Sequence, residues 1–279
     1  MSDLWEKCTI EDRKNLIGLA TDEKLVEWGL CMPGSSFAET SQYVAAELAR
    51  RLAERLKPST EPENHRCDHA KRKAWFHIRG GKKLYYEDPQ PQDMPVLELI
   101  QAIACERRFA NQIKTRYNVA NHSVLVYNIL KSWNTPKRAL VQGLIHDLHE
   151  GVTRDVSSPL AHNPDMAYFR KVCDGLLKAN CERAGVPFPL EPIVHKADKA
   201  ACKLEAQAFV DDRHPDWCEY LDDYPDADGF DPWSYLEDED RSVEVFLESL
   251  QEATCGVGSP EFHAEVDGWF KMALRDEIL

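Results

Sequence analysis

Three segments of the chain place histidine and aspartate side chains among apolar residues. In the stretch 140–159, LVQGLIHDLHEGVTRDVSSP, the adjacent pair His146-Asp147 follows two short apolar runs at 139–141 and 144–145. Burying an imidazole and a carboxylate without partners is costly. A divalent metal ion removes that cost, because it binds neutral imidazole nitrogen and carboxylate oxygen together. The pair therefore indicates a metal site.

Two more residues of ligand type lie on other expected helices. His122 begins a helical stripe at positions 122, 126, 129 and 133, and Asp198 lies on one at positions 194, 198, 201, 205 and 209. Each is a single polar ligand on a mostly apolar stripe that faces the core. One His-Asp pair occurs often by chance, whereas the whole set predicts a site for one divalent ion. Its mixed nitrogen and oxygen donors suit Mn²⁺, Co²⁺, Fe²⁺, Zn²⁺ or Mg²⁺, and the predicted ligands are His122, His146, Asp147 and Asp198.

Carboxylates near the pair can supply acid–base chemistry. If the segment is helical, Gly143, His146 and Glu150 share one face, and Gly143 lets another element approach closely. Asp155, in the loop that ends this helix, reaches the same pocket. Glu150 and Asp155 are therefore the predicted catalytic residues, which orient or deprotonate a water molecule or protonate a leaving oxygen. The alternative for Glu150 is an ordinary surface glutamate near a helix end.

The order His…His-Asp…Asp resembles the HD-domain metal-dependent phosphohydrolases. Over roughly residues 74–210 the chain is similar to the prophage-type, 5'-deoxynucleotidase-like branch of that superfamily. The matching phrases are Arg108-Phe109 before YNVANHS at 117–123, HDLHE at 146–150 before TRDVSSP at 153–159, and HKAD at 195–198 with Glu205 two turns later. The chain departs from the pattern at Ala161-His162, which replaces a frequent lysine, and at Arg154, where glycine is common.

This resemblance implies an all-α fold, an HD-domain helical bundle with a small N-terminal β-hairpin and extra helices at both ends. It also implies a homodimer that hydrolyses a nucleotide phosphate ester. Arg108 is then the predicted bidentate phosphate clamp, with a structural ion pair as the alternative. Phe109 is expected to wall a sugar or base pocket, and Lys199 to face either the phosphate or solvent. Glu205 is expected to orient the site from behind the ligands.

The first functional expectation is a 5'-deoxynucleotidase that releases phosphate from deoxynucleoside monophosphates. A deoxynucleoside triphosphate triphosphohydrolase is the alternative, with triphosphate as its product. A hypothesis of another class is a non-catalytic nucleotide-binding regulator. The HDLHE phrase argues against it, because a pure sensor need not keep a water-activating carboxylate beside the metal. A binuclear cyclic-dinucleotide phosphodiesterase is disfavoured, because the sequence has no second histidine-rich set.

Composition argues against several other classes of protein. The 279 residues have a formal net charge of −14. This argues against extended nucleic-acid binding or binding to an anionic membrane, since both depend on clustered Lys and Arg. No apolar run is long enough to span a bilayer, and the N-terminus lacks the apolar core of a signal peptide. The nine cysteines are scattered without paired spacing, as in a reducing compartment. A cytoplasmic protein is therefore expected.

The chain is expected to divide at about residue 66. Residues 1–66 form a predicted helical extension, and residues 67–279 form the core, with an acidic insertion at about 211–240. The histidines and the cysteine of 65–77 match no zinc spacing and are expected in a polar loop. Farther along, Gly80-Gly81 predicts a β-hairpin with a two-residue turn.

From Pro95 to about residue 210 the chain is expected to be helical, with short breaks at 135–136, 157–164 and 185–192. The acidic insertion has little periodicity. It is expected to be a loop that leaves the bundle and either is solvated or binds a partner. Two closing helices are expected at 243–253 and 260–279.

Overall fold

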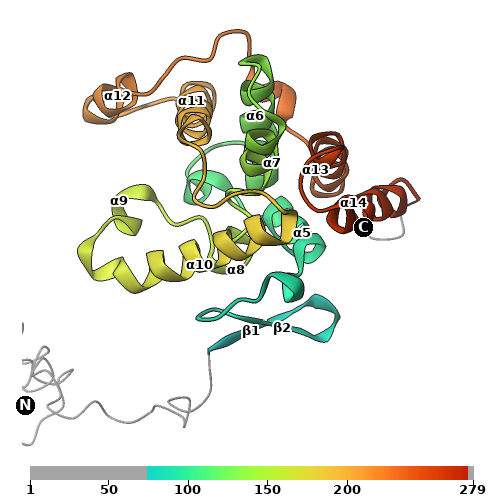
Figure 1. Ribbon diagram of the computed structural model, residues 1–279. Coiled ribbons are helices and arrows are strands. Elements are labelled where there is room, and N and C mark those ends of the chain that lie inside the picture. The colour runs from blue at the N-terminus through green and yellow to red at the C-terminus, as the bar shows by residue number, and fades with distance from the viewer. Residues whose placement is uncertain (1–73, 276–279) are drawn as a thin grey trace, which may run out of the picture. The chain divides into compact units, whose positions relative to one another are not determined.

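A computed structural model describes residues 74–275 (Figure 1). Contacts divide the protein after Asp68, and all described residues belong to the second unit, His69–Leu279. The predicted helices of 1–66 and most of the predicted polar loop lie outside the described residues. Within 74–275 the chain is mostly helical with one small two-stranded sheet. The all-α expectation is confirmed at that level.

A β-hairpin precedes the helices, with antiparallel strands β1 (Trp75–Ile78) and β2 (Lys82–Tyr85). The register pairs Ile78 with Lys82, so the turn holds three residues, Arg79–Gly81. The predicted two-residue turn is wrong, because this register leaves the arginine outside the ladder. Both glycines have positive φ, 76° and 77°, a conformation that is easy only without a Cβ atom.

Helices form most of the rest of the described unit, and none of those within 74–275 is long and apolar enough to cross a membrane. The last two confirm the expected closing helices. The bounds are α5 (Val96–Cys105), α6 (Val119–Ser132), α7 (Lys137–Ile145), α8 (Glu150–Thr153), α9 (Ser158–Ala161), α10 (Ala167–Ala184), α11 (Pro192–Phe209), α12 (Pro215–Asp222), α13 (Glu239–Thr254) and α14 (Pro260–Ala273).

Two interruptions of the predicted helical run were not visible in the sequence pattern. Helix α5 ends at Cys105, and residues 106–118 form a loop with a 3₁₀ turn at Arg108–Asn111. The second interruption follows Ile145, inside the phrase that carries the His-Asp pair. The first precedes α6, which carries His122, and the second contains His146 and Asp147.

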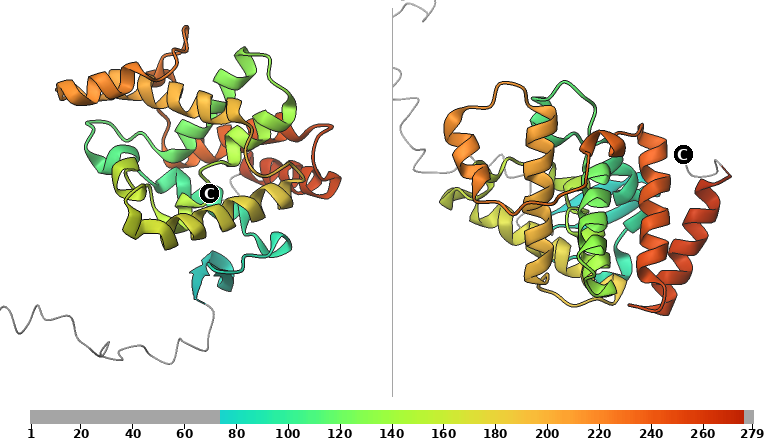
Figure 2. Two further views of the ribbon diagram at one scale, coloured as in Figure 1. Left: turned by 60° about the vertical axis from the view of Figure 1, so that its left-hand side comes forward. Right: turned by 90° about the horizontal axis from the view of Figure 1, so that it is seen from above.

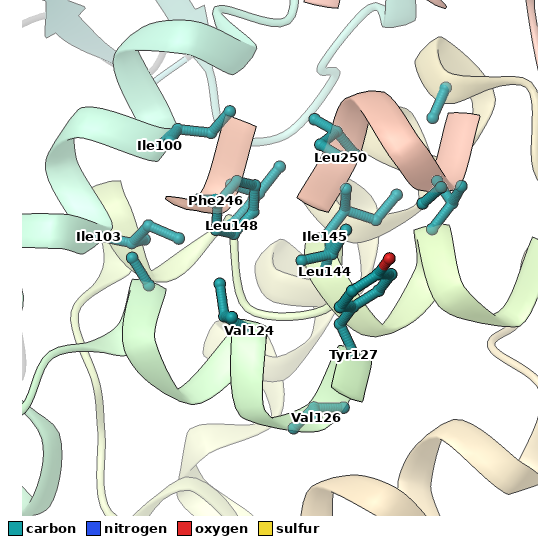
Figure 3. Packing of buried hydrophobic residues seen from close by; sticks show 14 of the residues in the cluster. Ile100, Ile103, Val124, Val126, Tyr127, Leu144, Ile145, Leu148, Phe246 and Leu250 are labelled. Carbon is teal, nitrogen blue, oxygen red and sulfur yellow. The ribbon is translucent and has the colours of Figure 1, made fainter. Parts of the chain in front are cut away.

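Helices α6 and α7 occupy the centre of the unit. Figure 2 shows α11 on one side of this pair and α13 on the other, with α14 outermost. Apolar side chains from α5, α6, α7 and α13 pack against one another in a single core (Figure 3). Fully burying one such side chain contributes roughly 1.5–3 kcal/mol. The buried residues include Ile100, Ile103, Val124, Leu144, Ile145, Phe246 and Leu250.

Gly143 allows α6 and α7 to approach closely, as its position in the sequence predicts. A Cβ atom at this residue would lie 2.5 Å from Cδ1 of Leu130 and 3.4 Å from Cγ1 of Val126. Both side chains belong to α6. The contact therefore sets how closely the end of α7 approaches the helix that carries His122.

The acidic insertion is partly folded, so the expectation of a loop throughout is wrong. It contains α12 and a 3₁₀ turn at Pro232–Tyr235. The side chain of Leu221 is buried, and the ring of Trp233 lies 4.9 Å from that of Phe209, at the end of α11. An eight-residue helix is too short to give a clear periodic pattern in the sequence. Its order comes from these tertiary contacts.

Candidate metal centre

Helix α6 carries His122 in its first turn. Asn118 caps the helix by accepting a hydrogen bond from the backbone N–H of Asn121 at 2.8 Å. Ser242 of α13 joins the two amide side chains: Asn118 Nδ2 donates to its hydroxyl at 3.0 Å, and this hydroxyl lies 2.9 Å from Asn121 Oδ1. This buried network holds the turn that places the completely buried imidazole of His122.

His146 directly follows α7, where the chain tightens into turns closed by i to i−3 hydrogen bonds. One of these runs from Glu150 N to Asp147 O at 3.0 Å. The prediction of one continuous helix that aligns Gly143, His146 and Glu150 is therefore wrong. The tighter winding is what directs the adjacent side chains of His146 and Asp147 toward the same place.

Helix α11 supplies Asp198 and, two turns later, Glu205. It begins at Pro192, a residue that suits the first helical position because it lacks the amide hydrogen. Glu205 is completely buried, whereas Asp198 is partly exposed. The predicted apolar stripe is buried at Val194, Ala201 and Phe209. Packing of this stripe turns both carboxylates toward α6.

These elements bring His122, His146 and Asp198 together. Each offers one ligand atom, and these atoms all lie within 4.8 Å of one another. Asp198 Oδ1 lies 3.1 Å from His122 Nε2 and 3.8 Å from His146 Nε2. Asp147, the fourth predicted ligand, lies outside that group of three but adjoins it. Its Oδ2 is 3.1 Å from His146 Nε2 and 3.6 Å from His122 Nε2.

The hydrogen bonds of both imidazoles fit a metal ion at this point. His122 Nδ1 lies 2.6 Å from Glu205 Oε1, and His146 Nδ1 lies 2.8 Å from the carbonyl oxygen of Gly143. A carbonyl oxygen only accepts, so His146 carries its proton on Nδ1 and its Nε2 offers a lone pair. That Nε2 is buried without a hydrogen-bond partner among the described residues. Histidine ligands of metals show this arrangement, with the second nitrogen bonded to an oxygen.

Arg108 lies behind the ligands rather than free beside them. Its Nη2 is 3.3 Å from Glu205 Oε2, and its Nη1 is 3.8 Å from Asp155 Oδ1. Its Nε is buried with no partner in the part of the chain that the structure describes. The predicted alternative of a structural ion pair thus has direct contacts, while the phosphate-clamp role stays a prediction.

Acidic residues around the cluster have pKa values shifted in opposite directions. Burial raises the pKa of Glu150 well above its usual range, and Asp147 and Asp155 nearby raise it further. Burial also raises the pKa of Asp155, although Arg108 opposes the shift. For Asp147, burial acts upward but the neighbouring His146 lowers the pKa below its usual range. Separated pKa values of this kind suit one proton donor and one permanently ionised carboxylate.

The other two predicted substrate residues lie at the edge of the site. The Phe109 ring is partly buried, with the guanidinium carbon of Arg108 5.6 Å from its centre. Lys199 is exposed, and its Nζ lies 5.3 Å from the ring centre of Tyr224. Two further histidines, His149 and His195, lie outside the group of three ligands.

Arg154 has a backbone conformation that is rare for a residue with a side chain. Its backbone has φ 75° and ψ 157°, a region that essentially only glycine adopts without strain. Glu106 holds the strained loop: it accepts a hydrogen bond from Arg154 Nη1, and its Oε1 lies 3.3 Å from the backbone N of Asp155. Sequence reasoning missed Glu106, because no motif or periodicity marked it.

Aromatic residues of the insertion were also missed as neighbours of the site. The Trp217 ring lies 6.2 Å from the Phe109 ring, and Tyr224 contacts Lys199. The abundance of aromatic residues in the insertion was the available signal, but no spacing related them to the ligands.

Comparisons with known proteins give similarity but no activity. No family model matches the chain. An uncharacterized protein of Rhodobacter capsulatus is 28% identical over 147 residues, which is 50% of this chain and 74% of that protein. The uncharacterized protein YfdR of Escherichia coli is 26% identical over 119 residues, 42% of this chain. The matched part spans 62% of YfdR.

Proposed function

We propose that the protein is an HD-type, divalent-metal-dependent phosphohydrolase that acts on nucleotides, with deoxynucleoside 5'-monophosphates as its substrates. The observation that carries the proposal is the convergence of His122, His146 and Asp198 on one point, with both Nδ1 atoms engaged elsewhere. Three separate elements contribute these atoms, so the arrangement is not a consequence of one local sequence. Asp147 adds a fourth donor beside them.

The donor set fits one divalent ion of the Mn²⁺, Co²⁺, Fe²⁺, Zn²⁺ or Mg²⁺ class. When bound, such an ion supplies Lewis-acid polarisation of the phosphoryl group and lowers the pKa of water. Around that position the protein's own residues have separate tasks. Glu150, with its raised pKa, suits protonation of the leaving oxygen. Asp155 suits orientation of the attacking water, and Arg108 holds Asp155 and Glu205 in place.

Charge near the site favours a monophosphate over a triphosphate. Among the described residues, cationic side chains next to the ligands include Arg108, already paired with two carboxylates, and the exposed Lys199. The insertion at 211–240 is rich in Asp and Glu and has Arg213 as its single Lys or Arg. Each added phosphate brings negative charge into these surroundings, which is unfavourable. The triphosphohydrolase alternative shares the same ligand chemistry and differs in product.

The preference for deoxynucleotides and the proposed homodimer rest on the sequence resemblance, whereas the proposed cytoplasmic location rests on the scattered cysteines. The non-catalytic regulator remains the alternative of another class. The unpartnered Glu150 carboxylate oxygen supports the enzyme over the regulator, because a binding protein gains nothing from burying an unsatisfied carboxylate. No partner for this oxygen exists among the described residues.

The test is a substrate panel on the full-length protein after chelation, with Mn²⁺, Co²⁺ or Mg²⁺ restored. Deoxy- and ribonucleoside mono- and triphosphates are compared, and phosphate and triphosphate are both measured. Asp147→Asn keeps the shape of the side chain but removes its charge, and Asp165→Asn, at an exposed aspartate, is the matched control. We expect metal-dependent phosphate release from deoxynucleoside monophosphates, lost in Asp147→Asn alone. Triphosphate release would select the alternative, and a metal-loaded protein without turnover would select the regulator.

A further inference from the structure

Two lines of contact lead from the ligand cluster to aromatic rings at the insertion. The first runs from His122 through Glu205 to Arg108, whose guanidinium carbon is 5.6 Å from the centre of the Phe109 ring. The Phe109 ring in turn meets the Trp217 ring of α12 edge to face, with centres 6.2 Å apart. The second line runs from Asp198 through its neighbour Lys199 to the ring of Tyr224.

Hydrogen bonds attach the insertion to α11 on both sides of α12. They fix the positions of Trp217 and Tyr224, the two rings that the insertion supplies. Arg213 donates from Nη1 to three carbonyl oxygens at the C-terminal end of α11, those of Ala206 (3.1 Å), Gln207 (3.1 Å) and Val210 (2.9 Å). Beyond α12, Lys203 of α11 donates to Tyr224 O at 3.2 Å and pairs with Asp226 at 2.8 Å. Because α11 also carries Asp198, one of the three clustered ligands and α12 are attached to the same helix. Figure 1 shows α12 beside α11.

The backbone that presents Phe109 is strained. Phe109, Ala110 and Asn111 have φ values of 56°, 48° and 62°, in the left-handed region that bulky residues rarely adopt. Hydrogen bonds hold this turn, from Arg108 N to Tyr117 O at 3.2 Å and from Gln112 N to Phe109 O at 2.8 Å. Strain of this kind persists where the surrounding structure demands it, commonly at sites that grip a ligand.

The three aromatic rings are not fully buried in the hydrophobic core. Phe109, Trp217 and Tyr224 are each only partly buried. Tyr220, whose hydroxyl accepts a hydrogen bond from that of Tyr224 at 2.7 Å, is 51% exposed. The insertion that carries Trp217 and Tyr224 is rich in Asp and Glu, which disfavours phosphate there but not an uncharged aromatic ring. Aromatic side chains bind nucleobases by stacking.

We propose that Phe109, Trp217 and Tyr224 form the nucleobase-binding face of the site, supplied mainly by the acidic insertion. This inference rests on the proposed function and names the part of the substrate that the insertion recognises. The phosphate lies toward the ligands and the base toward α12. The insertion then contributes binding of the base, and its charge excludes longer phosphate chains.

The experiment compares substrates with and without a base on the full-length, Mn²⁺-loaded protein. Deoxyadenosine 5'-monophosphate and deoxyribose 5-phosphate are assayed with wild type, Trp217→Ala, Phe109→Leu and, as a matched control, Trp75→Ala on the hairpin. Stacking of one base predicts that wild type prefers the nucleotide about 10- to 100-fold in kcat/KM. Trp217→Ala and Phe109→Leu are expected to lose most of that preference through a higher KM for the nucleotide. Trp75→Ala is expected to keep it.

Calorimetric binding of the same two probes to Glu150→Gln separates this inference from the proposed activity. Tighter binding of the nucleotide, weakened by adding Trp217→Ala, supports the base face even if no turnover is found. Equal binding of the two probes overturns the base face even if phosphate release is confirmed. Circular dichroism checks folding, and Phe109→Leu provides the test if Trp217→Ala does not fold. A preference for the nucleotide that survives both substitutions also overturns the inference.

Discussion

The corner where α10 meets α14 and the region around the ligand cluster both contain backbone with positive φ. At the corner these positions are glycines: Gly185, Gly256 and Gly258, at 70°, 76° and 82°. The nearby cap is also satisfied, since Ser259 Oγ accepts from Phe262 N at 3.2 Å. Around the ligands the positive-φ residues carry side chains: Phe109, Ala110, Asn111 and Arg154, at 56°, 48°, 62° and 75°.

The two regions therefore differ in how well the residue types suit their backbone conformations. The corner uses residues whose preferences agree with their conformation, as expected where stability alone matters. The ligand region holds unfavourable backbone conformations, which the surrounding packing must stabilise. Proteins break local rules in this way mainly at functional sites. The same reasoning predicts how the two regions respond to substitution.

The largest effect is expected at the corner. A Cβ atom on Gly258 would lie 2.2 Å from the carbonyl oxygen of Ala184, whereas a Cβ atom on Gly256 would meet nothing within 4 Å. Gly258→Ala should therefore lower the free energy of unfolding by about 2–4 kcal/mol. Gly256→Ala should lower it by about 1–2 kcal/mol, the cost of the left-handed backbone alone. Urea denaturation measures both, and equal losses would contradict the close contact.

The second largest effect is expected on metal affinity, from Glu205→Gln at the ligand region. The substitution keeps the shape of the side chain but removes the carboxylate that fixes the tautomer and orientation of His122. Loss of such a partner typically weakens metal affinity about 10- to 100-fold. Titration with Mn²⁺ measures it, with the exposed Glu248→Gln as control. Unchanged affinity in Glu205→Gln would show that His122 is not a ligand oriented in this way.

A third comparison concerns strain in the loop after α8. Both Arg154→Gly and Arg154→Ala remove the ion pair with Glu106, but only glycine fits φ 75° and ψ 157°. The glycine variant should be more stable than the alanine variant by about 1–2 kcal/mol. At ordinary positions alanine is the more stable of the two. Thermal unfolding of the pair measures the difference, and a more stable alanine variant would refute the strain.

The smallest effect is expected on the surface away from both regions. Lys131 Nζ donates to Glu252 Oε1 at 2.5 Å, and this hydrogen bond lowers the pKa of Glu252. Because the folded pKa is the lower one, the stabilisation is present above the unfolded pKa. It is lost as pH falls through the folded value. Glu252→Gln should lower the free energy of unfolding by less than about 1 kcal/mol at pH 7. In strong acid it should leave that free energy unchanged, which urea denaturation at both pH values measures. A large loss at pH 7 would contradict an exposed pair.

The sequence by itself determined the helical character of this protein and the residues able to bind a metal. Apolar stripes through His122 and Asp198 were long enough for their period to mark α6 and α11, because burial of one face requires that spacing. Gly143 could likewise be predicted as a point of close approach. These features depend on local pattern, which the sequence displays directly.

Only the tertiary structure decided how those residues meet. The break after α7 arises because packing and turn hydrogen bonds override the helical preference of HDLHE. The pairing of Arg108 with Glu205 joins residues far apart in the chain, so no local pattern encodes it. The order of α12 and the strain at Phe109 and Arg154 likewise depend on contacts made by distant segments. Such contacts are energetically decisive but have no period, and therefore they become visible only in the folded chain.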